Sequence, residues 1–287
     1  MTQLSEIRRA RPVLGTLVEI TARGTSAEQL AEAVNASFTE IQRVHDLMSF
    51  HERGSDISRV NRLAHRIPVR VHPWTWRVLL EARNLARKSR GAFNITVADR
   101  LVRWGYLPCP ISTRAAIRGD WHDVRLLPGH RVRLDRRVLI DLGGIAKGFA
   151  VDLAVAALQR HHVQSGLVNA GGDLRGFGSR RHVVHLRHPA YPGVFLPAFE
   201  LDSGALATSA AYFAQRVWRG RRVAPVVSRT GRPSITATSV TVAARTCMRA
   251  DALTKVCLLN GSSAARRLGG RAFVLAAEEL SPRLLAA

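Results

Sequence analysis

The chain has 287 residues, of which 46% are apolar, and it carries a formal net charge of +22. The apolar fraction excludes a disordered chain and allows a substantial core in one large domain or two small ones. The charge raises nucleic acid as a partner, but it comes almost entirely from arginines spread along the chain, without a basic block that has interleaved aromatics. We therefore expect a solvated basic surface that would still attract a phosphorylated ligand, and we keep nucleic-acid binding only as an alternative.

The sequence contains no apolar run long enough to span a bilayer, so membrane insertion is not expected. The N-terminus has basic residues without an apolar segment behind them, which is not the pattern of a signal peptide. Three scattered cysteines, Cys109, Cys247 and Cys257, favour neither a disulfide framework nor a zinc site. We expect a cytoplasmic protein, or an exported one if translation starts further upstream.

The first predicted elements are a strand and a long helix. Residues 13–21 alternate between apolar and polar side chains, as a strand does. Ser26 and Gln29 form a capping-box pattern, after which apolar residues recur at helical spacing as far as Met48.

A polar loop and a second helix follow. Residues 48–61 are too rich in Ser, Asp and Gly to be core, and either Ser55 or Asp56 would cap a short helix within them. A helix is expected over residues 73–90, with Gly91 as its C-terminal stop.

Residues 91–106 begin as a predicted strand and end with two aromatic residues, Trp104 and Tyr106. The two rings would either sandwich a flat ligand or pack as ordinary core aromatics. A hairpin is predicted over residues 132–141, with its turn at residues 135–136.

The centre of the chain combines a strand, two glycines and a helix. Residues 138–140 predict a buried strand that ends at Asp141, and a helix follows Gly143 and Gly144. Such a turn aims free backbone N–H groups at an anion, and Lys147 in the first helical turn would add a full positive charge. The alternative is a tight strand–helix turn without a ligand, which this stretch alone favours because glycine motifs often match by chance.

The second half of the chain adds further strands. A strand at 166–170, followed by a second glycine pair and Asp173, predicts a right-handed crossover unit with both glycine pairs at one rim. More strands are expected within 181–201 and at 240–243, with a small-residue turn at 204–212 between them.

A last helix is expected from about Arg249. Asp251 and Thr254 lie three residues apart and therefore share one helical face, and their oxygens are hard ligands suited to Mg²⁺. The alternative, which the local sequence favours, is that Asp251 stabilises the helix N-terminus while Thr254 bonds back to the preceding turn. Since no repeat or linker interrupts the chain, we expect a single domain over residues 1–287.

Seven stretches, in this order, resemble the ApbE family of flavin transferases. They are VLGT at 13–16, MSFHERGSDISRVN at 48–61, GAFNITV with WGY at 91–106, IDLGGIAKGFAVD at 140–152, NAGGD at 169–173, ATSAAY at 207–212, and SVTV with ADAL at 239–253. They cover almost the whole chain, and seven motifs in the correct order with sensible spacings are hard to obtain by accident.

The resemblance implies an α+β fold, a single ApbE-like (T-fold-like) domain with mixed β-sheets flanked by helices and FAD in a cleft between its halves. It implies an enzyme that binds FAD and Mg²⁺ and cleaves the FAD pyrophosphate. FMN would be attached through a phosphoester to a Ser or Thr hydroxyl in the acceptor motif of a target flavoprotein, with release of AMP. Phosphoryl transfer depends mainly on positioning and charge neutralisation, which suits the residues singled out above.

Carried over by position, the FAD contacts and metal ligands of the family fall on ten residues of this chain. Those implied to contact FAD are Leu14, His51, Trp104, Gly105, Tyr106, Asp141 and Lys147. Those implied to hold Mg²⁺ are Asp251, Thr254 and the backbone carbonyl of Gly144.

The chain departs from the family pattern at several of these positions. Leu14 stands where methionine is common, and His51 stands where tyrosine is common. Asn94 stands where aspartate is common. Lys255, one residue after Thr254, occupies the place of a frequent threonine metal ligand.

The largest departure lies at residues 224–231, APVVSRTG, where the family carries H-x-x-D-P-x-T-G. Ala224 occupies the position of the implied histidine base, and Val227 and Ser228 occupy the positions of the following aspartate and proline. The catalytic base is therefore unassigned. The first hypothesis is an FAD:protein FMN transferase, and the alternative is an FAD-binding protein that stores FAD or hydrolyses it slowly without transfer.

Overall fold

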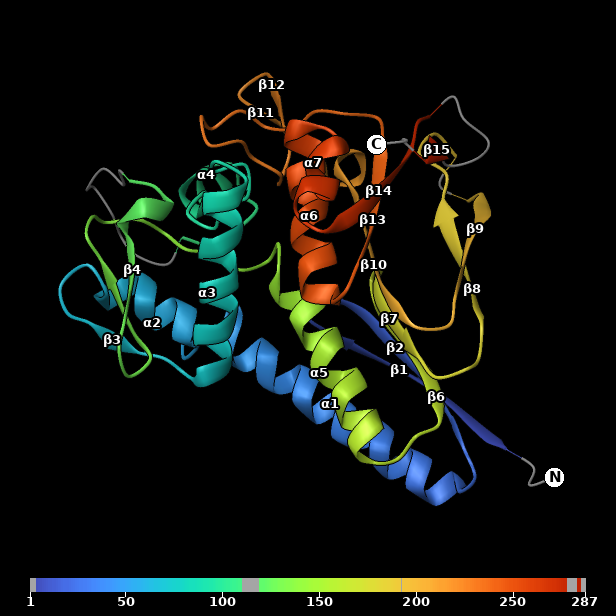
Figure 1. The fold of residues 1–287 in the computed structure, drawn as a ribbon. Helices are drawn as coiled ribbons and strands as arrows, with labels where there is room; N and C mark the ends of the chain where they lie inside the picture. The colour runs from blue at the N-terminus through green and yellow to red at the C-terminus, as the bar shows by residue number, and fades with distance from the viewer. Residues whose placement is uncertain (1–3, 110–118, 192, 278–282, 285–287) are drawn as a thin grey trace.

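The structure is a computed structural model that describes residues 4–109, 119–191, 193–277 and 283–284. An eight-stranded sheet is covered on one face by three long helices, α1 (Ala27–Met48), α5 (Ala146–Arg160) and α6 (Cys247–Asn260) (Figure 1). In order across the sheet, the strands are β1 (Ser5–Val13), β2 (Thr16–Gly24), β6 (Ser165–Ala170), β7 (Asp173–Phe177), β10 (Gly204–Ala210), β13 (Ser239–Ala244), β14 (Gly270–Leu275) and β15 (Arg283–Leu284). The predicted α+β fold with helix-flanked sheets is confirmed.

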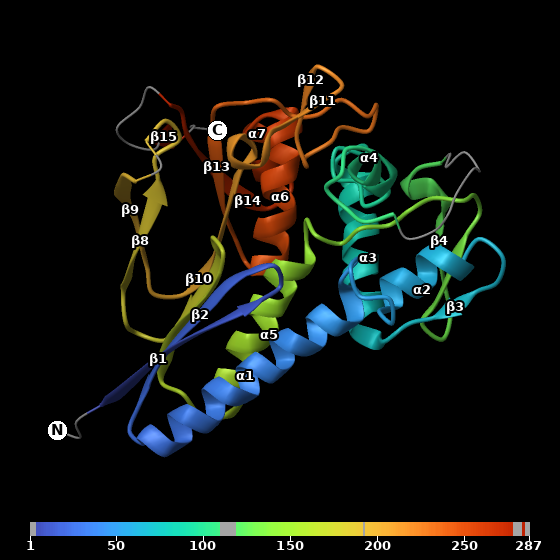
Figure 2. The ribbon, with the colours of Figure 1, turned by 180° about the vertical axis from the view of Figure 1, so that it is seen from behind.

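Alternation along β10 shows how the sheet separates two layers. Ala205 belongs to the large core beneath the helices, whereas Leu206 belongs to a smaller cluster on the opposite face. That smaller cluster is covered by a hairpin of β8 (His182–Arg187) and β9 (Phe195–Leu201), seen from behind in Figure 2. Both strands fall within residues 181–201, as predicted.

The first long helix forms for the reasons that the sequence indicates. The side chain of Ser26 caps α1 by accepting a hydrogen bond from the Gln29 N–H at 3.3 Å. The predicted apolar face of α1 is buried, and Ser37 on this helix donates to the Ala154 carbonyl of α5 at 3.1 Å.

A second group of elements lies beside the helical layer (Figure 1). It contains α2 (Asp56–Leu63), α3 (Pro73–Lys88), α4 (Ala98–Arg103) and a sheet in the order β3 (Val69–Arg70), β5 (Arg131–Leu134), β4 (Val124–Leu127). Ser55, rather than Asp56, caps α2. Gly91 stops α3 as predicted, with φ +81° and a hydrogen bond from its N–H to the Ala86 carbonyl.

The predicted strand at residues 138–140 is wrong. The segment is buried, but it is not part of a ladder, because the side-chain amide of Asn61 in α2 occupies both backbone groups of Ile140. The Asn61 Nδ2 donates to the Ile140 carbonyl at 2.9 Å, and the Ile140 N–H donates to the Asn61 Oδ1 at 2.8 Å. An apolar run crosses the core here outside any strand, with a side chain in place of a neighbouring strand.

The predicted crossover is therefore wrong as well. Every pairing of β6 is antiparallel, to β2 on one side and β7 on the other. Gly171 and Gly172, with φ +64° and +97°, form the two-residue turn between β6 and β7. This glycine pair closes a hairpin instead of framing a crossover.

Four further element predictions fail, each at a predicted or an observed turn. The strand expected at 13–21 is two strands, β1 and β2, joined at Leu14–Gly15, and the strand expected at the start of 91–106 is irregular backbone leading into α4. The hairpin expected over 132–141 instead pairs β4 with β5, and residues 128–130 link the two. The small-residue stretch at 204–212 begins as strand β10, because small side chains fit between the sheet and α6.

The remaining elements complete the chain. The helix expected from about Arg249 is α6, which begins at Cys247 after a Thr246 cap, and α7 (Ser263–Arg267) follows it. A small hairpin pairs β11 (Arg216–Trp218) with β12 (Arg221–Val223). Among the described residues, no helix is long and apolar enough to cross a membrane.

Candidate active site

Two cavities meet beside the N-terminus of α5. The first has a volume of about 400 Å³ and the second about 540 Å³. Four residues line both of them, namely Leu107, Asp141, Gly143 and Lys147. An elongated ligand that fills both cavities would pass over the loop that leads into α5.

The loop that leads into α5 has two glycines that leave its backbone accessible, and Asp141 fixes its position. The Asp141 N–H donates to the Ile95 carbonyl at 2.9 Å, next to the hydrogen bonds that Asn61 makes with Ile140. Burial raises the pKa of the Asp141 carboxyl above its usual range, although the Gly143 N–H and the Lys147 ammonium act in the opposite direction. Because Gly143 and Gly144 have no side chains, their backbone is accessible from the first cavity.

Close approach of α5 and α6 places their charged residues together. A Cβ on Gly148 of α5 would lie 2.2 Å from the Cys247 carbonyl oxygen of α6, so only glycine fits at this crossing. The Gly148 N–H, one of the free donors in the first turn of α5, bonds the Asp251 Oδ2 at 3.2 Å. The Asp251 carboxylate of α6 therefore partly neutralises the positive end of the α5 helix dipole.

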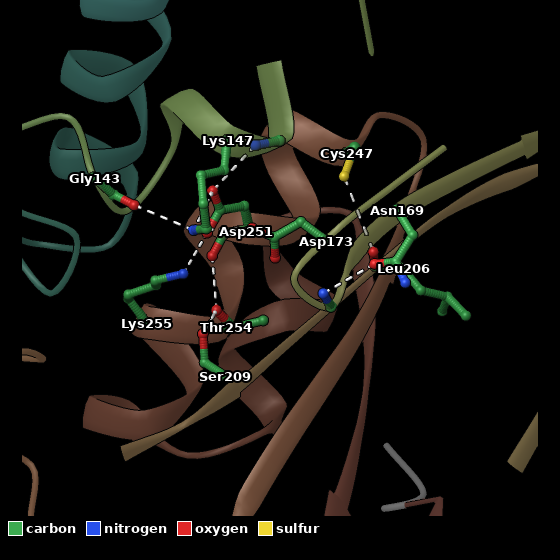
Figure 3. Close-up of polar contacts among 12 residues, drawn as sticks. Gly143, Lys147, Asn169, Asp173, Leu206, Ser209, Cys247, Asp251, Thr254 and Lys255 are labelled. Carbon is green, nitrogen blue, oxygen red and sulfur yellow. Dashed lines mark hydrogen bonds and ion pairs between the residues drawn. The ribbon is translucent and has the colours of Figure 1, made fainter. Parts of the chain in front are cut away.

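Two lysines and two aspartates form a cluster at this crossing (Figure 3), here called the charged cluster: Lys147, Asp173, Asp251 and Lys255. The Lys147 Nζ lies 2.9 Å from the Asp173 Oδ2 and 3.7 Å from the Asp251 Oδ2. Lys255 binds the other oxygen, Asp251 Oδ1. Both carboxylates are buried, whereas the side chains of Lys147 and Lys255 keep 27% and 18% of their surface exposed.

The pKa shifts follow from this arrangement. Burial opposes the charge of Lys147, but the carboxylates of Asp173 and Asp251 outweigh it and raise the pKa of its ammonium above the usual value. Burial likewise opposes ionisation of Asp251, yet its two lysines hold the pKa of this carboxyl below its usual range. Burial and the Asp251 charge raise the pKa of Asp173. Lys147 therefore stays protonated at neutral pH.

The predicted magnesium ligands are not arranged as an open site. The Thr254 hydroxyl donates to the Asp251 backbone carbonyl at 2.7 Å, which is the back-bonding alternative, and it also pairs with Ser209 Oγ at 2.7 Å. Lys255 and Lys147 occupy the Asp251 carboxylate, and Lys255 packs against Gly144, where a Cβ would lie 3.6 Å from Lys255 Cε. Among the described residues, no three His, Cys, Asp or Glu side chains gather as metal ligands. As they stand, these donors do not fit a divalent ion at Asp251.

The other predicted FAD contacts divide between the cavities. Leu14 and His51 line the second cavity, and Leu14 adopts φ +58°, an unfavourable backbone for a leucine that the β1–β2 turn imposes. Tyr106 lines the first cavity, and its hydroxyl lies within hydrogen-bonding distance of the Ala214 and Val223 carbonyls. Trp104 is buried in an apolar cluster with Leu101 and lines neither cavity, and neither does Gly105. The two aromatics therefore do not form a sandwich.

The stretch at residues 224–231 forms part of the wall of the first cavity. Pro225, Val226 and Val227 line it with aliphatic surface, while Ala224 is fully buried behind them. None of the described residues that line the first cavity is a histidine, whereas His45 and His51 line the second.

Asp173 and Ser209 are parts of the site that the sequence reasoning did not assign. Asp173 closes the NAGGD stretch, and Ser209 lies in the ATSAAY stretch that was expected to be a turn. Their positions in two of the resembling motifs were the available signal. Cys247, close enough to Asp173 to feel its charge and labelled in Figure 3, is a buried thiol without a disulfide, and burial raises its pKa.

Comparison with known proteins identifies the family that shares this sequence pattern and fold. The model of the ApbE family matches residues 14–274. This chain belongs to the ApbE family. An FAD:protein FMN transferase of Vibrio cholerae is 32% identical to it over 237 residues, which are 75% of this chain and 70% of the relative. A protein of the same name from Treponema pallidum is 32% identical over 61% of this chain and 53% of its own length.

Solved structures agree with the family assignment. The ApbE protein of Thermotoga maritima has a TM-score of 0.81 and 26% identity, with 95% of this chain and 94% of that chain covered. The flavinyl transferase ApbE of Pseudomonas stutzeri has the same TM-score at 22% identity, over 98% and 95% of the two chains, and supports the ApbE fold alone.

Proposed function

We propose that this ApbE-family protein transfers FMN from FAD to a Ser or Thr hydroxyl of a target flavoprotein. The relatives named FAD:protein FMN transferase support the reaction. The observation that carries the proposal is the pair of cavities that share Asp141, Gly143 and Lys147. FAD has two ring systems joined by a pyrophosphate, so it matches two cavities joined at a site with backbone N–H groups and a lysine.

The reaction moves one phosphoryl group. The acceptor oxygen attacks the FMN phosphorus, the bond from that phosphorus to the bridging oxygen breaks, and AMP leaves with the bridging oxygen. The acceptor proton goes to water or a phosphate oxygen. Lys147 and the backbone of Gly143 and Gly144 would bind the pyrophosphate and stabilise the charge that develops on it.

No residue is assigned as the base, because none of the described residues that line the first cavity is a histidine. A general base contributes about 10²–10⁴-fold, so its absence slows transfer without abolishing it. We therefore expect slow but measurable transfer unless His51 of the second cavity takes this role. The aliphatic wall at 224–231 also favours the alternative, an FAD-binding protein without transfer.

The remaining parts of the proposal concern the whole chain. One core cluster runs from Val18 of β2 to Ala272 of β14, which supports a single ApbE-like domain over residues 1–287. The acceptor motif and the cytoplasmic location, or export from an upstream start, stay predictions, whereas the predicted Mg²⁺ ligands do not fit a divalent ion as they stand.

The test is to incubate the protein with FAD and a flavin-acceptor domain, then look for fluorescent acceptor on a denaturing gel. Lys147→Gln should lower transfer about 10²-fold, whereas the matched control Lys88→Gln, on the exposed end of α3, should not. A thermal shift with FAD but no labelled acceptor would support the alternative. A shift with duplex DNA and none with FAD would overturn both.

A further inference from the structure

Lys255 occupies the position at which a metal ion would contact Asp251. It lies one helical turn after Asp251 on α6, binds the Asp251 Oδ1, and lines the first cavity. Its aliphatic stem packs beside Gly144, whose backbone belongs to the loop that would bind the pyrophosphate. The ammonium is thus fixed between the carboxylate and the loop, at one wall of the cavity.

A divalent ion at Asp251 would have to displace this ammonium or lie next to it. Both choices are unfavourable, because like charges repel strongly at short distance and a displaced Lys255 would leave its only carboxylate partner among the described residues. Lys147 adds a second positive charge 3.7 Å from the same carboxylate. Asp173, the other buried carboxylate, is already paired with Lys147.

We infer that Lys255 is a built-in cation that replaces the divalent metal in this chain and neutralises the substrate pyrophosphate. An ammonium has three N–H donors, and Asp251 takes one of them, so others are available to a phosphate oxygen in the cavity. The consequence is FAD cleavage that does not depend on added metal. This inference rests on the proposed function for its substrate.

The experiment compares the wild type with Lys255→Thr, which removes the ammonium and adds a hydroxyl ligand beside Asp251. FAD turnover to FMN is measured with EDTA and with Mg²⁺. The wild type should be active in EDTA, within about twofold of its rate in Mg²⁺. Lys255→Thr should fall about 10²-fold in EDTA and recover at least tenfold in Mg²⁺. Lys255→Arg should stay independent of metal, and Lys88→Thr should behave as the wild type.

A second readout is independent of turnover. Mn²⁺ is titrated into each protein in the presence of FAD, and the electron paramagnetic resonance signal of free Mn²⁺ is recorded. The wild type and Lys255→Arg should not bind Mn²⁺ at micromolar concentrations, whereas Lys255→Thr should bind one ion. A wild type that binds Mn²⁺ as tightly as Lys255→Thr, or that loses its turnover in EDTA, overturns the inference. If neither the wild type nor the variants turn over FAD, but Lys255→Thr binds Mn²⁺ and the wild type does not, the proposed function fails and the inference on the cation stands.

Discussion

The first cavity has two walls of opposite character. On the α5–α6 side, the charged cluster has two buried carboxylates and two lysines, and each of its ionic groups has a partner. On the other side, Pro225, Val226 and Val227 offer only aliphatic surface. One wall is able to bind and neutralise a phosphate, while the other has no group that could accept a proton.

This difference separates two requirements of the proposed reaction. Charge neutralisation acts on the phosphate and needs fixed cations, whereas proton removal acts on the acceptor and needs a titratable group close to it. The chain supplies the first through Lys147 and Lys255, whereas the described residues that line the first cavity include no histidine and only Asp141 as a carboxylate. Each of the first three changes below alters one wall and leaves the other intact.

The largest effect is expected from Asp251→Ala. Since Asp251 has no exposed surface and contacts two lysines and the Gly148 N–H, its removal leaves buried positive charge unpaired. Unfolding free energy should fall by about 3–5 kcal/mol, and FAD turnover should be lost. Urea unfolding measures the first quantity, with Asp46→Ala on the exposed side of α1 as the control. A variant as stable and active as the wild type would contradict the role given to this cluster.

A smaller loss is expected from Gly148→Ala, which changes the same wall without touching a charge. The added methyl group would lie 2.2 Å from the Cys247 carbonyl oxygen and must push α5 away from α6. We expect a loss of about 1–3 kcal/mol in unfolding free energy, together with weaker FAD binding. Gly54→Ala is the matched control, because its methyl group meets nothing within 4 Å. Equal stability of the two variants would show that the helix crossing tolerates separation.

The opposite wall is tested by introducing a base. Val226→His places an imidazole on the cavity surface and should speed single-turnover transfer by about 10-fold or more, with the rate rising as pH increases through about 6.5. Ala224→His should bring no such gain, because Ala224 is fully buried and a histidine there must displace packed neighbours. A faster Ala224→His would mean that this segment rearranges when FAD binds.

The smallest effect concerns Asp141, between the two cavities. Burial holds its folded pKa above the unfolded value, so the folded protein takes up a proton first as pH falls. The unfolding free energy of the wild type, relative to that of Asp141→Asn, should therefore rise as pH falls through the folded pKa. This rise should be complete below the unfolded pKa. Urea unfolding at pH 7 and pH 4 measures this difference, and a constant difference would show that Asp141 keeps its charge.

The sequence predicted those features that depend on local pattern. Helix caps, the buried face of α1 and the strands β8 and β9 depend on residues close together in the chain, and all are found. Predictions that assumed a strand neighbour for residues 138–140 failed, since the neighbour is a side chain 79 residues away. No local pattern shows that Asn61 would supply these hydrogen bonds.

The candidate site was predictable to a similar extent. Lys147 and Asp251 were recognised through resembling motifs, but their direct approach depends on Gly148 at the helix crossing. Lys255 was recognised only as a departure, because its spacing from Asp251 is also that of an ordinary surface ion pair on a helix. The difference is burial, which is set by the packing of α5, α6 and the glycine loop together.

The contact of Asn61 with Ile140 has a consequence for motion in the site. Two hydrogen bonds from one side chain set the position of the segment that delivers Asp141, and that side chain belongs to α2, beside the helical layer. Local opening of α2 would therefore release the Ile140 amide and loosen the loop that leads into α5 in the same event. The rate of amide hydrogen exchange at Ile140 should therefore match that of α2 and not that of the sheet. The local stability of α2 would then set how often the site opens.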